Sequence, residues 1–212
     1  YWSFDEGSGT TIYDLSGFGR NGIIIVNSGT YQWVDGKVGK AINWQPICST
    51  NCAYINSRVD VNTFSINTPP MSIIVWVKPN ANSISTVMRG ISGGSPPCSG
   101  TSNSGYFGLD GRIWFNCSWE NGISLGSFSA GQWYFLAGSI DTNFKINFYK
   151  NDQKILNGVL PTYQISQTGG AFRIATRNDA WGDYFNGIID EVRVYNRALS
   201  DQEIKALYDA TK

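Results

Sequence analysis

Histidine is absent from the 212 residues of the chain. Its absence excludes a Ser-His-Asp or Cys-His catalytic group, and it excludes any zinc site that relies on imidazole ligands.

Charged residues are also scarce, at 15% of the chain where about a quarter is usual, and the 16 basic and 16 acidic residues cancel. Without a basic excess the chain has no electrostatic footprint for a phosphate backbone, and we expect no nucleic-acid partner.

Long apolar runs and a leader segment are missing as well. No stretch approaches the roughly 18 consecutive apolar residues of a membrane span, so we expect no insertion into a membrane. The sequence shows no signal peptide and begins within a strand-like segment, Tyr1–Phe4, which is typical of a processed or excised fragment.

Glycine and aromatic residues are abundant instead. The chain has 24 glycines and is 14% aromatic, which favours short strands joined by tight turns. Apolar residues occupy both alternating faces of Ser72–Lys78, as in a central strand, and Asp110-Gly111 predicts a hairpin. No linker or repeat divides the sequence, so residues 1–212 are expected to form one all-β domain. The expected strands are Gly22–Val26, Lys40–Trp44, Ser72–Lys78, Ser85–Ile91, Tyr106–Leu109, Arg112–Cys117, Trp133–Ile140, Lys145–Lys150, Ala171–Thr176 and Gly187–Tyr195.

A helix signal lies near the C-terminus. Ser200 and Glu203 have the spacing of a capping box, in which each side chain bonds to the backbone of the other residue. Ile204, Leu207 and Tyr208 then form an apolar edge at helical spacing. We expect one short helix that packs on the outside of the β domain.

The four cysteines are Cys48, Cys52, Cys98 and Cys117. Their spacing fits no zinc pattern, because a single close pair is present and histidine is absent. Two disulfides, Cys48–Cys52 and Cys98–Cys117, close the shortest loops of the possible pairings; four buried free thiols are the alternative. Disulfides indicate an oxidising, extracellular compartment.

Three segments resemble the laminin-G-like jelly-roll family of the concanavalin A-like lectin/glucanase superfold: Tyr1–Ile25, Trp33–Trp44 and Phe185–Tyr208. The strand-like segments Met71–Pro79 and Gly131–Asp141 also match that pattern. The resemblance implies a sandwich of two antiparallel sheets with the first and last strands adjacent. It further implies a module appended to secreted enzymes, adhesins or surface proteins, with a glycan or an extracellular protein as partner. Two insertions, 45–58 and 92–105, depart from the family pattern and fall in loops, where specificity usually resides.

One carboxylate interrupts an apolar alternation near the C-terminus. Ile188, Asp190, Val192 and Val194 share a face of the expected last strand, and an ionised Asp facing a core is costly unless it is paired. If the first and last strands are adjacent, Asp5 lies close to Asp190, and two neighbouring carboxylates repel unless a cation lies between them.

The expected cation is calcium, which takes six to eight oxygen ligands, many of them backbone carbonyls. The resemblance also implies a structural calcium ion in this region. We expect Asp5, Asp190 and the Gly39 carbonyl as ligands, with Asp14 as a further one, and Glu6 replaces Asp5 if the register differs by one residue. In the alternative, Asp190 accepts backbone N–H bonds or pairs with an arginine, Arg193 or Arg197.

The acidic residues do not form the pattern of a glucanase. Those enzymes place acids along one strand as E-x-D-x-x-E, whereas the glutamates here are the scattered Glu6, Glu120, Glu191 and Glu203. Asp190 and Glu191 are adjacent, and neighbouring strand residues point to opposite faces. We therefore expect no enzymatic activity.

Aromatic and amide side chains in two loops suit saccharide recognition instead. Trp181, Asp183 and Tyr184 crowd into one loop, and Trp119 lies in a second turn. In the alternative these aromatic rings are ordinary packing residues.

The leading interpretation is a secreted, calcium-stabilised, non-catalytic module that binds carbohydrate or an extracellular protein. Its alternatives are a self-assembling subunit of a surface filament, sheath or virion decoration and, more weakly, a glucanase-like glycoside hydrolase.

Overall fold

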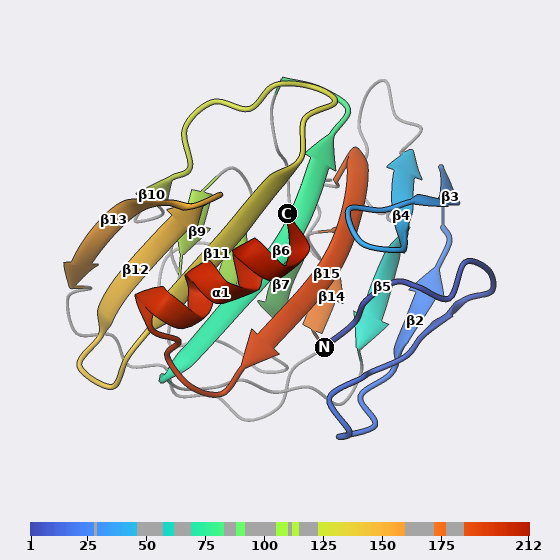
Figure 1. Cartoon of the computed structure of the whole chain (residues 1–212). Coiled ribbons are helices and arrows are strands. Elements are labelled where there is room, and N and C mark those ends of the chain that lie inside the picture. Colours follow the sequence, from blue (N-terminus) through green and yellow to red (C-terminus); the bar gives the residue numbers. More distant parts are fainter. Residues whose placement is uncertain are drawn as a thin grey trace, which may run out of the picture.

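Two antiparallel β-sheets pack face to face in the computed structural model of the chain, and a single described helix lies on the outside of one sheet (Figure 1). The sheets enclose the main apolar core between them. The expected fold, a two-sheet jelly-roll sandwich with a short C-terminal helix, is confirmed. The structure describes residues 1–27, 29–45, 57–61, 69–82, 88–91, 105–109, 112–114, 123–159, 172–176 and 185–212.

The seven-stranded sheet is built around β6, Met71–Pro79, which pairs with β11 on one side and β15 on the other. Ile73, Val75 and Val77 of β6 enter the main core, whereas Ile74 and Trp76 enter a second cluster on the outer face. The predicted two-sided burial of this strand is therefore confirmed. The order across the sheet is β13 (Gln153–Val159), β12 (Lys145–Lys150), β11 (Tyr134–Ile140), β6, β15 (Gly187–Tyr195), β4 (Lys40–Gln45) and β3 (Thr30–Asp35).

The eight-stranded sheet forms the opposite layer. Its β8 and β9 pair in an antiparallel hairpin on either side of Asp110-Gly111, as the turn signal predicted, and the two turn residues themselves lie outside the described residues. The order across the sheet is β1 (Thr11–Ile12), β2 (Gly22–Ile25), β5 (Arg58–Val61), β14 (Phe172–Ile174), β7 (Met88–Ile91), β8 (Gly105–Leu109), β9 (Arg112–Trp114) and β10 (Ile123–Ser124).

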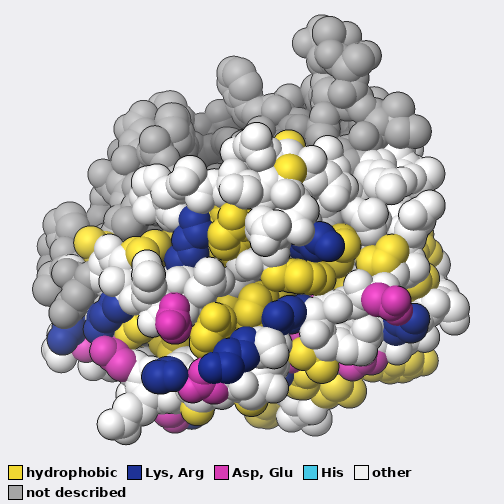
Figure 2. Space-filling view, turned by 45° about the horizontal axis from the view of Figure 1, so that its top comes forward, with side chains coloured by type: hydrophobic (Ala, Val, Ile, Leu, Met, Phe, Trp, Pro, Cys, Tyr) yellow, Lys and Arg dark blue, Asp and Glu magenta, His cyan; other side chains and the backbone are white. Residues whose placement is uncertain are grey.

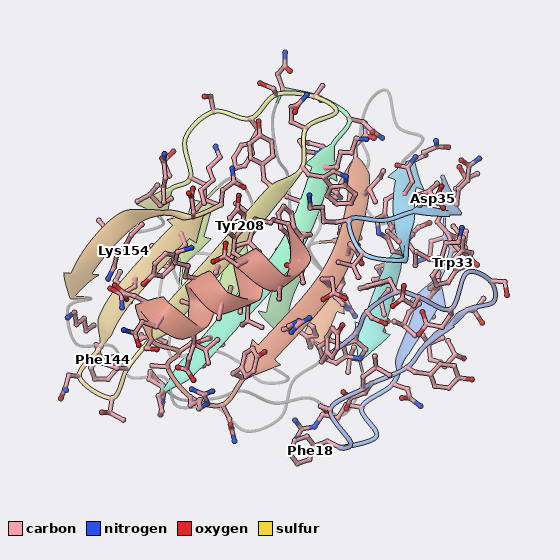
Figure 3. The ribbon with its side chains drawn as sticks, viewed as in Figure 1. Phe18, Trp33, Asp35, Phe144, Lys154 and Tyr208 are labelled. Atoms are coloured by element: carbon pink, nitrogen blue, oxygen red, sulfur yellow. The ribbon has the colours of Figure 1, made fainter. Side chains whose placement is uncertain are left out.

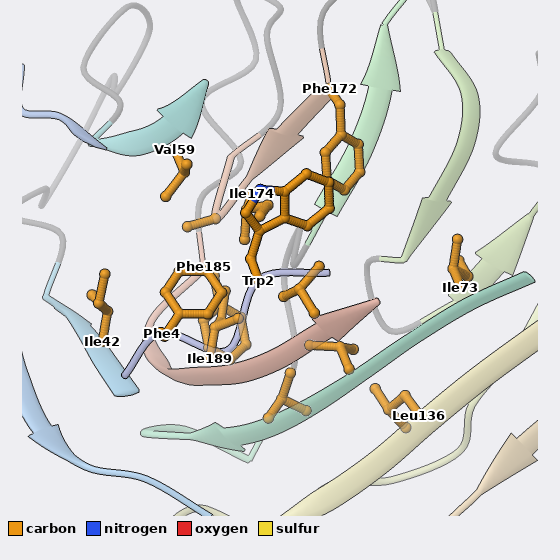
Figure 4. Close-up of a cluster of buried hydrophobic side chains, with 14 of the residues drawn as sticks. Trp2, Phe4, Ile42, Val59, Ile73, Leu136, Phe172, Ile174, Phe185 and Ile189 are labelled. Carbon is orange, nitrogen blue, oxygen red and sulfur yellow. The ribbon is translucent and has the colours of Figure 1, made fainter. Parts of the chain in front are cut away.

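The N-terminal segment lies beside β15, the last strand (Figure 1). Trp2 N donates to Val192 O at 2.9 Å and Val192 N donates to Trp2 O at 3.0 Å, so the expected adjacency of the first and last segments is confirmed. The N-terminal segment makes an isolated bridge there, and no named strand covers it. Trp2 also stacks on Phe172 of the other sheet at 5.4 Å between ring centroids, which ties the N-terminal segment into the core (Figure 4).

A bulge in β15 changes the predicted alternation. The register with β6 shifts between Asp190 and Arg193, and Glu191 adopts a left-handed backbone with φ of 54°. As a result Ile189 and Val192, three residues apart, both enter the main core. The prediction that Asp190 shares a face with Val192 is wrong, because a bulge inserts one extra residue into the alternation.

Helix α1, Asp201–Thr211, crosses the outer face of the seven-stranded sheet over β6, β11 and β12 (Figure 1). Both bonds of the predicted capping box between Ser200 and Glu203 are present. Tyr208 stacks on Trp76 at 5.8 Å, and Trp76 Nε1 donates to Thr211 Oγ1 at 2.8 Å. The predicted packing of the helix on the outside of the sandwich is thus confirmed.

Charged side chains of both signs are interspersed with apolar ones on the face that carries the helix (Figure 2). In the described part of the chain, no helix is long and apolar enough to cross a membrane.

Replacing Ile204 by Ala tests whether the helix is an integral part of the sandwich. Ile204 is 1% exposed and packs in the outer cluster, so its truncation leaves a cavity and should lower the free energy of unfolding by about 2–4 kcal/mol. Urea unfolding followed by tryptophan fluorescence measures this change. Lys205→Ala, on the exposed side of the same helix, is the matched control, and equal effects of the two substitutions would contradict the packing described here.

Candidate metal centre and ligand-binding hollow

Asp190 lies in β15 with its side chain fully buried. Its Oδ2 accepts hydrogen bonds from the backbone N–H of Lys37 at 2.8 Å and of Val38 at 3.0 Å. Its Oδ1 is buried and has no hydrogen-bond partner among the described residues. One oxygen of the carboxylate is therefore satisfied by backbone amides, as one of the sequence-based alternatives proposed, and the other is left over.

The two arginines considered as partners of Asp190 pair with glutamates instead. Arg193 forms a close ion pair with Glu191, and Arg197 pairs with Glu203 at 2.7 Å. The charge of Asp190 is therefore opposed by backbone dipoles and by no ion pair within the described part of the chain.

The turn that binds Asp190 joins β3 to β4 and contains Gly36 and Gly39. The backbone N–H of Gly36 donates to the carbonyl of Gly39 at 3.0 Å. A Cβ atom on Gly36 would lie 2.6 Å from Asp190 Oδ2, and one on Gly39, where φ is 57°, would lie 1.9 Å from Asp5 Oδ1. Both positions require glycine because the carboxylates approach the backbone too closely for any side chain.

Asp5 contacts the same turn. Asp5 Oδ1 accepts the backbone N–H of Lys40 at 2.8 Å, one residue after Gly39. The structure therefore brings three of the predicted metal ligands, Asp5, Gly39 and Asp190, to one turn, although Asp5 and Asp190 are far apart in the sequence.

Burial dominates the electrostatics of Asp190. It raises the pKa of the carboxyl to about 7; the negative charge of Glu191 adds to this rise, and the backbone N–H groups of Val38, Lys37 and Glu191 oppose it. Near neutral pH the ionised form is thus no longer strongly favoured. A cation at Oδ1 would hold the group ionised.

Asp14, the fourth predicted ligand, is bonded elsewhere. Its carboxylate accepts the backbone N–H groups of Ser16 and Arg20, both at 2.9 Å, and the backbone nitrogen of Tyr1 at 3.1 Å. Burial alone would raise its pKa, but these donors outweigh burial and hold the pKa well below its usual range. Asp14 thereby fixes the N-terminal loop 14–20.

Glu6, the predicted substitute for Asp5, accepts the backbone N–H of Tyr13 at 2.8 Å through Oε1. In the ranges that the structure describes, no group of three or more Cys, Asp or Glu side chains could hold a metal ion. A cation at the β3–β4 turn would therefore depend on two carboxylates and on backbone carbonyl oxygens.

The residues predicted to bind a saccharide lie outside the described residues. They are Trp119, Trp181, Asp183 and Tyr184, and the same holds for Cys48, Cys52, Cys98 and Cys117. Their roles remain predictions.

The structure shows a hollow of about 460 Å³ where the N-terminal loop meets the end of β15. Phe18, at the tip of that loop, is 71% exposed, and the Arg20 guanidinium lies 4.9 Å from its ring centroid (Figure 3). Arg193 lies 4.2 Å from the ring of Tyr1. The lining residues are Tyr1, Trp2, Asp14, Ser16, Phe18, Arg20, Arg193, Val194, Tyr195 and Asn196.

Sequence reasoning missed this hollow because its walls come from opposite ends of the chain. The one available signal was Phe18, a large aromatic residue between Gly17 and Gly19 in a segment otherwise expected to be a tight loop. Aromatic faces, planar guanidinium groups and an amide are side chains that can contact the apolar face and the hydroxyl groups of a sugar.

Comparison with solved structures shows the same fold in proteins of several activities. Domain 4 of an extracellular arabinanase from Geobacillus stearothermophilus, solved with arabinotriose, is 23% identical over 98% of this chain and 96% of that chain, with a TM-score of 0.68. A Trypanosoma rangeli sialidase, solved with sialic acid, is 12% identical over 98% of this chain and 32% of its own length, with a TM-score of 0.68.

The binding domain of botulinum neurotoxin DC, solved with rat synaptotagmin II, is 14% identical over 99% of this chain and 53% of that domain, with a TM-score of 0.63. The fold is thus shared by glycoside hydrolases and by binding domains, and it does not decide between catalysis and binding.

A comparison with the sequences of curated proteins finds no match. The sequence pattern of the Concanavalin A-like lectin/glucanases superfamily, in its laminin G-like form, matches residues 53–205. This match covers most of the chain and agrees with the sandwich of two antiparallel sheets. The chain belongs to the laminin G-like family of the Concanavalin A-like lectin/glucanases superfamily.

Proposed function

We propose that the chain is an extracellular, non-catalytic module that binds carbohydrate and is stabilised by calcium. The observation that carries this proposal is the fold match to domain 4 of the arabinanase. It extends over 98% of this chain and 96% of that domain, so a unit of the same size and fold was solved in complex with an oligosaccharide. The hollow beside Phe18 supplies aromatic and hydrogen-bonding groups for such a ligand.

The adjacent acids of β15 support a binding role over hydrolysis. Asp190 and Glu191 are 0% and 2% exposed, and Glu191 already binds the hydroxyl of Tyr1 at 2.6 Å and the guanidinium of Arg193. A glycoside hydrolase needs two carboxyl groups on either side of the scissile bond in an open cleft. Neither of these acids is open to a substrate.

An extracellular protein is the second candidate ligand. It is favoured by the toxin binding domain of the same fold, which was solved with rat synaptotagmin II, and by the strongly exposed ring of Phe18. Large exposed aromatic residues are enriched in protein interfaces.

The calcium proposal depends on the unmatched oxygen of Asp190. Asp190 Oδ1 is buried without a partner in the described structure, and Asp5 lies against the same glycine turn. These residues fit a hard cation that prefers oxygen ligands: Asp5 and Asp190 would hold it, with the Gly39 carbonyl as a further donor. The ion would supply positive charge that neutralises both acids and fastens the N-terminal segment to the turn.

Two aromatic substitutions test the proposed ligand. On a glycan array the chain should bind oligosaccharides, and Phe18→Ala should weaken that binding by about fivefold or more if the hollow is the site. Trp181→Ala should do so if the loop predicted from the sequence is the site. Leu15→Ala, an exposed residue of the same N-terminal loop that does not line the hollow, is the control for Phe18. An array that shows no bound glycan would refute the carbohydrate proposal.

Removal of calcium tests the proposed ion. At a pH of about 8, EDTA should lower the melting temperature of the wild type, and added calcium should raise it in a concentration-dependent way because the ion binds the folded state alone. Asp190→Asn should abolish this response, whereas Asp209→Asn, a surface change in α1, should preserve it. A melting temperature that does not respond to EDTA, together with an Asp190→Asn variant of wild-type stability in calcium, would refute the calcium site.

The pH dependence of stability follows from the pKa of Asp190. Its folded-state value of about 7 lies above the unfolded value of about 3.9, so the protonated form favours folding. In EDTA this stabilisation should be complete below a pH of about 4 and should disappear as the pH rises through about 7, a loss of up to roughly 4 kcal/mol. Urea unfolding of the wild type and of Asp190→Asn between pH values of about 4 and 8 isolates the effect. Parallel curves for the two proteins would contradict it.

A further inference from the structure

A charged group lies on the outer face of the eight-stranded sheet, away from the main core. Val59 and Val61 of β5 and Phe172 and Ile174 of β14 enter the core, so the residues between them face outward. Asp60 of β5 lies directly opposite Arg173 of β14 in the register. Arg58 precedes Asp60 by two residues and therefore shares its face.

One carboxylate serves two guanidinium groups in this cluster of Arg58, Asp60 and Arg173. Arg58 donates to Asp60 through Nε at 2.7 Å and through Nη2 at 2.9 Å. Arg173 Nε lies 2.9 Å from the same Oδ1 that accepts Arg58 Nε. The bidentate bond to Arg58 uses both oxygens of the carboxylate, so Arg173 shares an oxygen that is already bonded.

Arg173 keeps unused hydrogen-bonding capacity. Its side chain is 14% exposed, and its Nε and Nη1 are both buried with no hydrogen-bond partner among the described residues, so the contact of Nε with Asp60 is an ion pair without hydrogen-bond geometry. Burial lowers the pKa of Arg173; the charge of Asp60 opposes this shift, and the charge of Arg58 adds to it. A buried guanidinium group with an unbonded N–H is costly unless an anion or another acceptor binds it.

The register places another arginine in the neighbouring strand β7. In the backbone register, Arg173 of β14 lies between Asp60 of β5 and Arg89 of β7. The next register position is Gly108 of β8, a residue without a side chain. Asp60, Arg173 and Arg89 therefore occupy one register row across β5, β14 and β7, and Arg58 lies two residues before Asp60 on β5.

We propose that this arginine cluster binds the oxyanion of an acidic saccharide, and specifically a carboxylate of the uronate type. The planar guanidinium group of Arg173 can donate two parallel hydrogen bonds to a carboxylate, a geometry that an ammonium group cannot reproduce. The exposed Ile23, opposite Asp60 in the register on the other side of β5, offers an apolar contact for a sugar ring. The inference rests on the proposed carbohydrate function and names the class of sugar.

The test begins with the wild-type chain and three matched probes in calorimetric titrations: a galacturonate trimer, a neutral galactose trimer and a sulfated galactose trimer. The galacturonate trimer should bind at least about tenfold more tightly than the neutral one, and added salt should weaken that preference. The sulfated trimer separates the two sources of an oxyanion, and equal or tighter binding of the sulfate ester would overturn the assignment to a carboxylate.

Substitutions then locate the site. Arg173→Gln should remove the preference for the acidic trimer. Arg173→Lys should keep only part of it, because an ammonium group has the positive charge but cannot donate two parallel hydrogen bonds to a carboxylate. Arg197→Gln, with a 53% exposed side chain paired to Glu203, is the control and should leave the preference unchanged. Asp60→Asn should act in the opposite direction and tighten binding of the acidic trimer, because it removes the competing carboxylate.

The outcomes separate this inference from the proposed function. If acidic and neutral trimers bind the wild type equally, the arginine cluster is structural and the inference fails while the carbohydrate proposal survives. If the wild type binds no saccharide on the array or in the titrations, both fail. If Arg173→Gln does not fold, the preference of the wild type and the effect of Asp60→Asn still decide whether the arginine cluster binds the carboxylate. Weaker binding of the acidic trimer by Asp60→Asn than by the wild type would overturn the inference.

Discussion

The bond between Asp190 and the β3–β4 turn is the contact on which the arrangement of the chain ends depends. Lys37 and Val38 donate to a carboxylate that lies 153 and 152 residues away in the sequence. At the end of the same turn, Lys40 donates to Asp5. The N-terminal segment pairs with β15 through the single bridge of Trp2, so the turn, together with the burial of Trp2 and Phe4, fixes its position. The two glycines of the turn allow both carboxylates to approach.

Two buried ionisable side chains without a complete set of hydrogen bonds are the sites where a bound ligand would stabilise the sandwich. Most buried polar groups in a folded protein are hydrogen-bonded, and an unbonded ionisable group is costly. Asp190 Oδ1 is such a group on the seven-stranded sheet, and Arg173 Nη1 is its counterpart of opposite sign on the eight-stranded sheet. A cation at the first and an oxyanion at the second would remove both costs. The same physical argument thus links stabilisation by calcium with recognition of an acidic sugar.

Local sequence signals anticipated much of the fold. The two-sided apolar pattern of Ser72–Lys78, the capping box of Ser200 and the hairpin signal at Asp110-Gly111 each depend on neighbouring residues, and the structure agrees with all of them. The bulge in β15 could not be anticipated, because the residue with left-handed backbone is Glu191, where no glycine signals the conformation. The bulge is also what brings Val192 into the same core as Ile189, so that Val192 no longer shares a face with Asp190.

The candidate sites were harder to predict for a related reason. The hollow joins Tyr1 and Phe18 to Tyr195, and the arginine cluster joins Arg58 to Arg173, so each depends on the pairing of distant segments. Strands β5 and β14 have four and three residues, too few for alternation alone to fix the register. The resemblance of the two chain ends to a known family supplied the one long-range contact that the sequence could give, which placed Asp5 near Asp190.

Amide hydrogen exchange measured by NMR tests most directly whether Asp190 holds the chain ends together. The backbone amides of Lys37 and Val38 lie in a turn, where rapid exchange is usual, but their bonds to a buried carboxylate predict protection comparable to that of Trp2 and Val192. Asp190→Ala should accelerate exchange at all four amides together. Rapid exchange of Lys37 and Val38 in the wild type, with Trp2 and Val192 still protected, would contradict the account.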